Sequence, residues 1–202
     1  YGYIQGAEDA AAELGLPDGA IKVMYHYIGN FDETDTNKAT AKTMYQEGTE
    51  VIFACGGSVG KSVMSAASEA EAKVIGVDVD QRYDSDTVIT SATKGLGASV
   101  ISVLEAIYKT ESWTDFAGKT TYFNAANDGV GLPTVVIGDE EADAFDRFEA
   151  FNKETYDELF QRLVDGSVKP IREIPVEDPS GIATAEELTS GLNLVKVSVT
   201  TR

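Results

Sequence analysis

Hydrophobic and polar positions alternate along the chain in a way that separates strands from helices. Short, nearly continuous apolar runs are typical of strands buried on both faces of a parallel sheet. Longer segments with helical spacing lie between them, and the first two of these end at a glycine. The predicted strands are residues 21–27, 50–55, 73–78, 87–90 and 119–123, and the predicted helices are 3–14, 36–47, 61–72 and 92–109. This alternation predicts an α/β fold, a doubly wound parallel sheet with right-handed crossovers.

The alternation opens on a helix, residues 3–14, where a strand would normally come first. We therefore expect the chain to be a fragment whose own first strand is missing. On that interpretation, the lack of a targeting segment carries no information on localisation.

The pattern changes after residue 128, with a turn-rich stretch at 129–133. The following residues predict a strand at 135–137, a long amphipathic helix at 140–164 with a kink near 151–152, an extended segment at 170–179, a short helix at 183–188 and a strand at 194–199. The aromatic residues of the long helix are expected to pack in a core. We therefore predict one α/β lobe over residues 1–130 and a tail over residues 131–202.

Polar and glycine-rich loops follow three of the predicted strands. If strands 21–27, 50–55 and 73–78 are neighbours, these loops meet at the sheet edge where open α/β proteins bind ligands. The first loop contains Asn30 and Phe31. An aromatic ring in a polar loop either stacks on a flat ligand or covers the core, and the residues alone leave both alternatives open.

The second loop contains Gly56 and Gly57, just before a predicted helix. Glycine lets the backbone approach a ligand, and the start of a helix presents free N–H groups. The nearby Lys61 and Ser62 are reminiscent of a phosphate-binding loop, but both glycines stand too close to Gly60 for that motif. The loop therefore favours a neutral ligand that touches backbone amides.

The third loop begins with Asp78, followed by Asp80 and Gln81. A carboxylate at a strand end is suited to two vicinal hydroxyls, as in ribose sites, although it is also a common helix cap. Asp78 and Asp80 are not expected to act as a catalytic pair of carboxylates. Lys94 lies near the start of a predicted helix, where a cation opposes the helix dipole. It is therefore expected to point at a ligand or to pair with Asp78.

Composition narrows the function classes. The 202-residue chain has a net charge of −18, which disfavours binding to nucleic acid. Its single cysteine excludes an internal disulfide. One cysteine and one histidine are also too few for a Cys/His zinc site, which needs four clustered ligands. Cys55 lies in an apolar strand and is expected to be a buried, inert thiol. Without a nucleophile paired to a base, the chain is expected to be a binding protein rather than an enzyme, with no cofactor or metal.

Several stretches together resemble the basic membrane protein family of solute-binding lipoproteins, which includes purine-nucleoside receptors of ABC importers. The most specific is Ile75-Gly76-Val77-Asp78-Val79-Asp80-Gln81. The other matching stretches are residues 2–7, 27–32, 48–57, 89–94 and 128–132, in the family's order. The resemblance covers about residues 1–135, and the tail matches loosely.

The resemblance implies one lobe, the C-terminal one, of a type I periplasmic-binding fold, with the tail crossing the hinge. It implies that Phe31 stacks on a base beside Asn30, that Gly56 and Gly57 line the pocket, and that Asp78 takes ribose hydroxyls with Lys94 beside it. The intact protein would be extracytoplasmic, anchored to the cell membrane by a lipid on an N-terminal cysteine, and partnered by an ABC permease. Its ligand would be a nucleoside or a similar small molecule.

Two other interpretations remain at this point. A ligand-sensing domain of a transcription regulator shares this fold. A Rossmann-like enzyme domain is disfavoured, because no dinucleotide fingerprint is present.

Overall fold

The computed structural model describes residues 1–139, 141–170 and 189–200. The chain forms two compact units, one built from residues 1–29 with 169–202 and the other from residues 30–168. The predicted helix at 183–188 and most of the extended segment at 170–179 lie outside the described residues. The predicted division near residue 130 stays a prediction.

The first unit joins the two ends of the chain. Helix α1 (Gly2–Glu13) precedes strand β1 (Ile21–His26), which pairs in parallel with β6 (Val195–Thr200). The Glu8 carboxylate accepts N–H groups of Asn193, Leu194 and Val195 at 2.7–3.2 Å. The hydrogen bond from Asn193, followed by those from the next two residues, lowers the Glu8 pKa. The predicted strand at 194–199 is thus confirmed as β6.

The condition that strands 21–27, 50–55 and 73–78 are neighbours is met only in part. Residues 51–53 pair with 73–75, whereas β1 forms a two-stranded sheet with β6. Both strands alternate apolar and polar residues, as in Val23 and Val197, which are opposite each other in the register. Because β6 has a matching pattern, the backbone N–H and C=O groups of β1 find their hydrogen-bond partners in β6.

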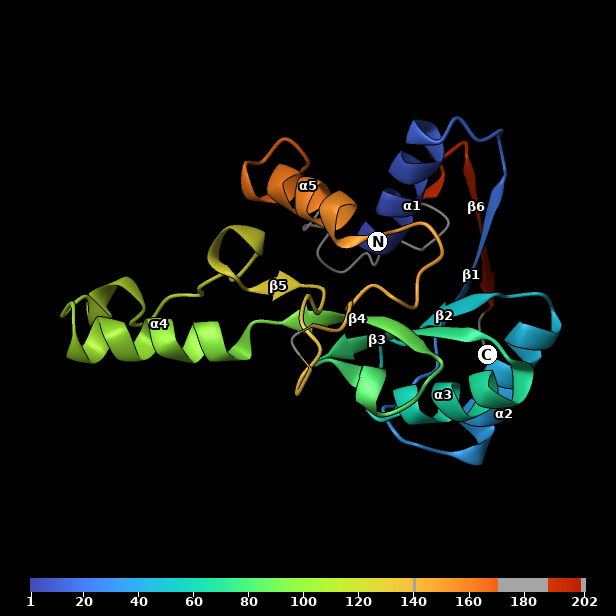
Figure 1. Cartoon of the computed structure of the whole chain (residues 1–202), viewed down its shortest axis with the longest axis horizontal. Helices are drawn as coiled ribbons and strands as arrows, with labels where there is room; N and C mark the ends of the chain where they lie inside the picture. Colours follow the sequence, from blue (N-terminus) through green and yellow to red (C-terminus); the bar gives the residue numbers. More distant parts are fainter. Residues whose placement is uncertain (140, 171–188, 201–202) are drawn as a thin grey trace. The chain divides into compact units, whose positions relative to one another are not determined.

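The second unit contains a four-stranded sheet of order β2-β3-β4-β5 (Figure 1). Strands β2 (Val51–Phe53), β3 (Lys73–Asp78) and β4 (Val88–Lys94) are parallel, and the short β5 (Val130–Gly131) is antiparallel to β4. Helices α2 (Asp35–Gln46) and α3 (Val59–Ala70) pack together, and α3 lies on β3. The α/β class and the parallel sheet predicted from the sequence are therefore confirmed.

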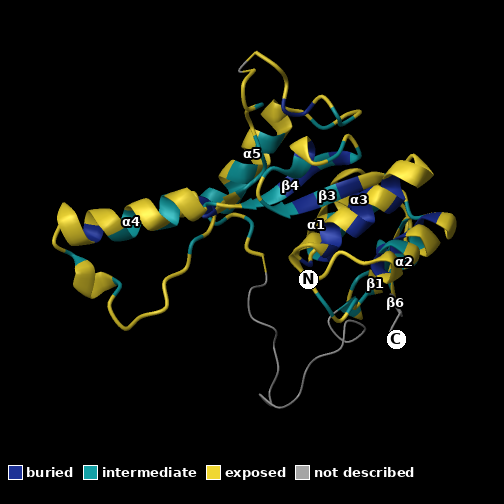
Figure 2. Cartoon of the chain, turned by 90° about the horizontal axis from the view of Figure 1, so that it is seen from below, coloured by how far each residue is buried: buried dark blue, intermediate teal, exposed yellow. Residues whose placement is uncertain are grey.

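The core of this unit lies between α3 and the sheet. Val63, Met64, Ala66 and Ala67 on α3 are buried, as Figure 2 shows for this helix, and Val74 and Val88 are buried on adjacent strands. The sheet is tight at its centre. A Cβ on Gly76 would lie 2.6 Å from the Ser91 hydroxyl and 2.7 Å from Gln81 Oε1, so glycine is required there.

The remaining elements follow the sheet. They are η1 (Gln81–Tyr83), α4 (Leu96–Tyr108), η2 (Trp113–Asp115), η3 (Ala125–Asn127) and α5 (Lys153–Val164). Within the described residues, no helix is long and apolar enough to cross a membrane.

Several predicted boundaries shift. Residues 119–123 are irregular instead of a strand, and 135–137 contribute one bridge, Val136 to Asp139. The helix predicted at 92–109 begins only at Leu96, because β4 continues to Lys94.

The long helix predicted at 140–164 is restricted to α5, which the Asn152 side chain caps by accepting the Thr155 N–H. Before it, the Phe145 ring packs against the rings of Phe148, Phe151 and Tyr156, as expected for a core cluster.

A buried arginine explains why that stretch is not helical. The Arg82 guanidinium pairs with Asp80 at 2.6 Å and donates to the carbonyl of Ala144 at 2.6 Å. Arg147 donates to the carbonyl of Val88, also at 2.6 Å. These contacts hold Ala144 and Arg147 against η1 and the start of β4, and an α-helix would use the Ala144 carbonyl internally.

Candidate functional site

The ends of three adjacent parallel strands carry the candidate site in the second unit. Gly56 and Gly57 follow β2, Asp78 ends β3 and Lys94 ends β4. In the sheet, β3 lies between the other two strands, so all of these residues belong to one edge. This is the edge at which α/β sheets bind ligands.

The loop that carries Phe31 is held by partly buried hydrogen bonds. The buried Asn37 side chain donates to Asn30 Oδ1 at 2.8 Å and to the Asp32 carbonyl at 2.7 Å. Thr34 caps α2, and its N–H donates to the Ser62 hydroxyl on α3 at 3.0 Å. Asn30 therefore shapes the loop, which is attached to α2 and α3 independently of β1.

The Phe31 ring projects from this fixed loop. It is 74% exposed, so the sequence-based alternative of a plug over the core does not apply. Gly57 has a left-handed backbone with φ of 57°, and a Cβ there would lie 3.8 Å from the Phe31 side chain. The ring thus lies beside the glycine loop. Burying an aromatic side chain contributes about 1.5–3 kcal/mol, and an exposed ring lacks this contribution until a ligand covers it.

Asp78 and Lys94 form an ion pair across the ends of β3 and β4. Lys94 Nζ lies 2.6 Å from Asp78 Oδ1, and both side chains remain well exposed. Of the two alternatives for Lys94, pairing with Asp78 is the one the structure contains. Asp78 has a left-handed backbone with φ of 71°, which a non-glycine residue adopts at some cost. The strand end therefore turns its carboxylate out to the surface.

Asp80 has a different role, because it pairs with the buried Arg82. Burial acts to raise the Asp80 pKa, but hydrogen bonds from Arg82 outweigh it and hold that pKa below its usual value. Gln81 is also structural, because its Oε1 accepts the Val77 N–H at 2.8 Å and its own N–H donates to Ser91 at 3.0 Å.

Cys55 corrects a prediction. The thiol is exposed at the end of β2 instead of buried in the core, because β2 ends at Phe53 and the chain turns outward before Gly56. Partial burial raises the Cys55 pKa, and the nearby Asp78 carboxylate raises it further. Cys55 follows β2 and Asp78 ends β3, and these two strands are adjacent in the sheet.

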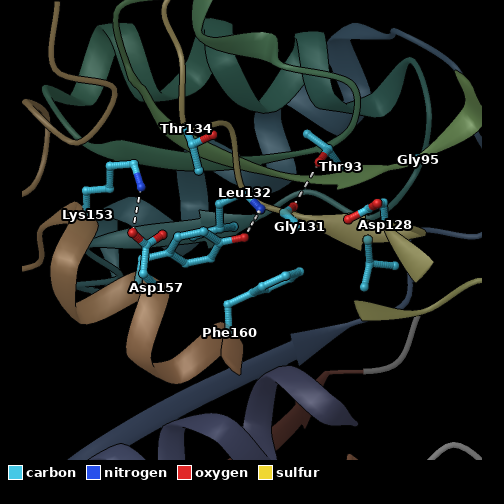
Figure 3. Close-up of a pocket in the computed structure, with 11 residues that line it drawn as sticks. Thr93, Gly95, Asp128, Gly131, Leu132, Thr134, Lys153, Asp157 and Phe160 are labelled. Carbon is cyan, nitrogen blue, oxygen red and sulfur yellow. Dashed lines mark hydrogen bonds and ion pairs between the residues drawn. The ribbon is translucent and has the colours of Figure 1, made fainter. Parts of the chain in front are cut away.

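The sequence did not point to a cavity beside β4 and β5. A cavity of about 310 Å³ lies between the β4–β5 end and α5 (Figure 3). Its wall is fixed by hydrogen bonds. Thr93 donates to the Gly131 carbonyl at 2.9 Å, and the Tyr156 hydroxyl accepts the Leu132 N–H at 3.0 Å. Burial raises the Tyr156 pKa.

Charged and aromatic groups of α5 line this cavity. Lys153 Nζ pairs with Asp157 at 2.6 Å, and the Phe160 ring packs on Tyr156 with centroids 5.5 Å apart. The spacing of aromatic residues in this helix predicted that they pack in a core, and Tyr156 packs in this way. The cavity itself depends on β5, which was not predicted from the sequence. The Phe31 ring and the Asp78–Lys94 ion pair of the strand-end site do not line this cavity.

Comparison with known proteins places the chain in a family. The model of PnrA-like ABC transporter substrate-binding proteins matches residues 1–178. Basic membrane protein D of Borreliella burgdorferi is 35% identical over 135 residues, which cover 65% of this chain and 37% of that protein. The ABC transporter nucleoside-binding protein BmpA of Lactococcus lactis is 33% identical over 149 residues, covering 65% and 40% respectively. The chain thus spans about two fifths of the length of these curated relatives.

Solved structures agree on the fold. An ABC transporter solute-binding protein from Aeropyrum pernix superposes with a TM-score of 0.65 at 21% identity, covering 88% of this chain and 53% of that one. A transcriptional activator of the comK gene from Bacillus halodurans gives a TM-score of 0.55 at 15% identity, covering 87% and 64%. The fold is therefore shared by a transport protein and a regulator, whereas the family match is specific. The chain belongs to the PnrA-like family of ABC transporter substrate-binding proteins.

Proposed function

We propose that this chain contributes one wall of a nucleoside-binding site in the substrate-binding component of an ABC importer. The observation that carries the proposal is the Phe31 ring, 74% exposed on a hydrogen-bonded loop beside Gly57. A nucleobase stacked on this ring would remove apolar surface from water. Such stacking is worth about 1–3 kcal/mol and tolerates different bases.

The ion pair supplies the polar half of the site. In our proposal Asp78 accepts hydrogen bonds from two ribose hydroxyls, each worth about 1.5–3 kcal/mol because the acceptor is charged. Lys94, at 2.6 Å from Asp78 Oδ1, holds the carboxylate in place while leaving part of it open. Gly56 and Gly57 let the ligand touch the backbone, and Asn30 keeps the loop in place.

The nucleoside assignment is supported by two independent lines. The exposed ring and the carboxylate suit the flat base and the vicinal hydroxyls of one small molecule. The Lactococcus lactis relative is named as nucleoside-binding. By family membership we further propose that the intact protein acts outside the cytoplasm, is tethered to the membrane by an N-terminal lipid and delivers its ligand to an ABC permease.

The experiment that tests the site is isothermal titration calorimetry of the chain with adenosine, guanosine and inosine, with ribose and 2′-deoxyadenosine as comparison ligands. We expect nucleosides to bind and the deoxy compound to bind about tenfold more weakly, since it lacks one hydroxyl for Asp78. We expect weaker affinity than in a protein of the relatives' full length, because closure of two lobes adds contact area. Equal binding of the ribose and deoxyribose forms would refute the role of Asp78.

A further inference from the structure

The backbone turns sharply at Asp78, where β3 ends. The Val79 N–H donates to the Val77 carbonyl at 2.8 Å and closes a three-residue turn around Asp78. Because the central residue has a φ of 71°, this is the γ-turn with positive φ, which is rare and strained. Glycine adopts such a conformation without steric cost, whereas aspartate does not. The surrounding structure therefore has to hold Asp78 in this turn.

The Gln81 side chain supplies that support. The Ile75 carbonyl accepts the Ala54 N–H at 3.1 Å, just after β2 has ended. Val77 lies two residues further along β3, so its backbone faces the same side, beyond the end of β2. There Gln81 Oε1 accepts the Val77 N–H at 2.8 Å. Gln81 thus takes the place of a partner strand for the residue from which the turn starts.

Two residues of the sheet keep Gln81 in this position. The hydroxyl of Ser91, which is buried, accepts the Gln81 N–H at 3.0 Å. A Cβ on Gly76 would lie 2.7 Å from Gln81 Oε1 and 3.0 Å from Gln81 Cβ. The missing side chain at Gly76 therefore leaves the space in which Gln81 folds back over β3 to reach Val77.

We propose, resting on the function proposed above, that Gln81 is a positioning residue that keeps the γ-turn closed, directs the Asp78 carboxylate toward the ribose hydroxyls and so sets the preference for ribose over deoxyribose. The ion pair with Lys94 joins two well-exposed side chains, and such a pair is weak by itself. The direction of the carboxylate therefore depends on the backbone turn. Gln81 acts through Val77 and not through contact with the ligand.

The sugar of the ligand is the part that reports on this turn. A carboxylate displaced by an open turn loses its hydrogen bonds to the hydroxyls. Adenosine offers two vicinal hydroxyls and loses more than 2′-deoxyadenosine, which lacks one of them. Stacking on Phe31 is retained, because the loop that carries this ring is attached to α2 and α3.

Calorimetry with adenosine and 2′-deoxyadenosine tests the proposal. The unmodified chain should prefer adenosine about tenfold. Gln81→Met keeps the side chain long and removes the acceptor, so it should bind adenosine about tenfold more weakly and reduce the preference to below about twofold. Gln46→Met makes the same change at an exposed position at the end of α2 and is the matched control, with the preference of the unmodified chain.

Amide hydrogen exchange followed by NMR gives a second readout that needs no ligand. The Val79 N–H closes the turn, so it should exchange about tenfold faster in Gln81→Met than in Gln46→Met. Ser91→Ala removes the acceptor of the Gln81 N–H and should shift both readouts in the same direction. This variant keeps the proposal testable even if Gln81→Met does not fold.

Two outcomes would overturn the role of Gln81. One is a Val79 N–H that exchanges equally fast in Gln81→Met and in the control. The other is a Gln81→Met chain with a lower melting temperature and an intact preference for adenosine, which would show that Gln81 only stabilises the fold. Failure of the proposed function is distinguishable, because the unmodified chain itself would then bind both nucleosides equally or not at all, while Val79 exchange would still respond to Gln81→Met.

Discussion

Lys94 Nζ lies 2.6 Å from Asp78 Oδ1, joining the ends of two neighbouring parallel strands at the surface of the sheet edge. Exposed ion pairs contribute little to stability, about 0–1 kcal/mol. An ion pair at this edge is therefore of more interest for what it offers a ligand than for what it adds to folding.

Replacing Asp78 with Ala should weaken nucleoside binding about tenfold or more, since it removes a charged hydrogen-bond acceptor. Lys94→Met should weaken binding less, because Asp78 remains. Calorimetry measures both affinities. The control is Glu105→Ala, which breaks the exposed pair with Lys109 far from the strand ends and should leave affinity unchanged. Unaltered binding by the Asp78 variant would place the ligand elsewhere.

Phe31→Ala should lower nucleoside affinity about tenfold or more through loss of stacking. It should change the melting temperature little, because the ring is 74% exposed. Leu14→Ala removes a comparably exposed apolar side chain, 73%, from the other unit and serves as the control. A large drop in melting temperature with intact affinity would show that the ring supports the fold instead.

Asn37→Ala should destabilise the second unit by about 1–3 kcal/mol, because it removes a buried side chain whose two hydrogen bonds hold the Asn30 loop. It should also weaken nucleoside binding without touching the ligand, since the loop that carries Phe31 loosens. Urea unfolding and calorimetry measure the two effects. Thr40→Ala, which loses only an exposed bond to the Thr36 carbonyl, should change stability by less than about 0.5 kcal/mol.

Low pH should reduce the contribution of Asp80 to the stability of the fold. Its pKa is lower in the folded chain, so its ionised form stabilises the fold above the unfolded aspartate pKa of about 3.9, and that stabilisation is lost as pH falls through the folded pKa. Asp80→Asn should therefore lower the melting temperature at pH 7, and the gap from the unmodified chain should narrow below about pH 4. A gap that is constant from pH 7 to about pH 2.5 would contradict this coupling.

Cys55 should report on Asp78. Its raised pKa keeps the thiol protonated near neutrality, so alkylation by iodoacetamide should be slow at pH 7 and accelerate at higher pH. Asp78→Asn should speed the reaction at a fixed pH, because the carboxylate helps to raise that pKa. A saturating nucleoside should slow it by covering the strand ends. Mass spectrometry of the alkylated chain follows the rate, and no protection by ligand would argue against the proposed position of the site.

The sequence was sufficient to place chemistry at strand ends. Asp78 and Gly56 follow apolar runs, and the carboxyl ends of parallel strands necessarily share an edge, so their proximity could be predicted. The Asp78–Lys94 pair was one of two alternatives derived from the dipole argument. The exposure of Phe31 could not be derived, because it depends on Asn37 and Ser62, whose hydrogen bonds join three separate segments.

The predictions of secondary structure that were wrong concern segments whose conformation depends on partners distant in the chain. The stretch before Lys153 has helical spacing, but Arg82 claims the Ala144 carbonyl from 62 residues away. Residues 119–123 have the composition of a strand, yet no neighbouring strand pairs with them among the described residues. Strand β1 selected β6, more than 170 residues later, over the nearer β2. Local patterns carry no information about such choices.

The bonds from Glu8 to Asn193, Leu194 and Val195 also set an order of events during synthesis. Residues 30–168 can collapse as soon as they emerge from the ribosome, since they form a compact unit of their own. Helix α1 and strand β1 must wait until residues 195–200 have been synthesised before β6 arrives. During that interval β1 lacks its partner strand, and slow translation of the segment between the two strands would prolong this state.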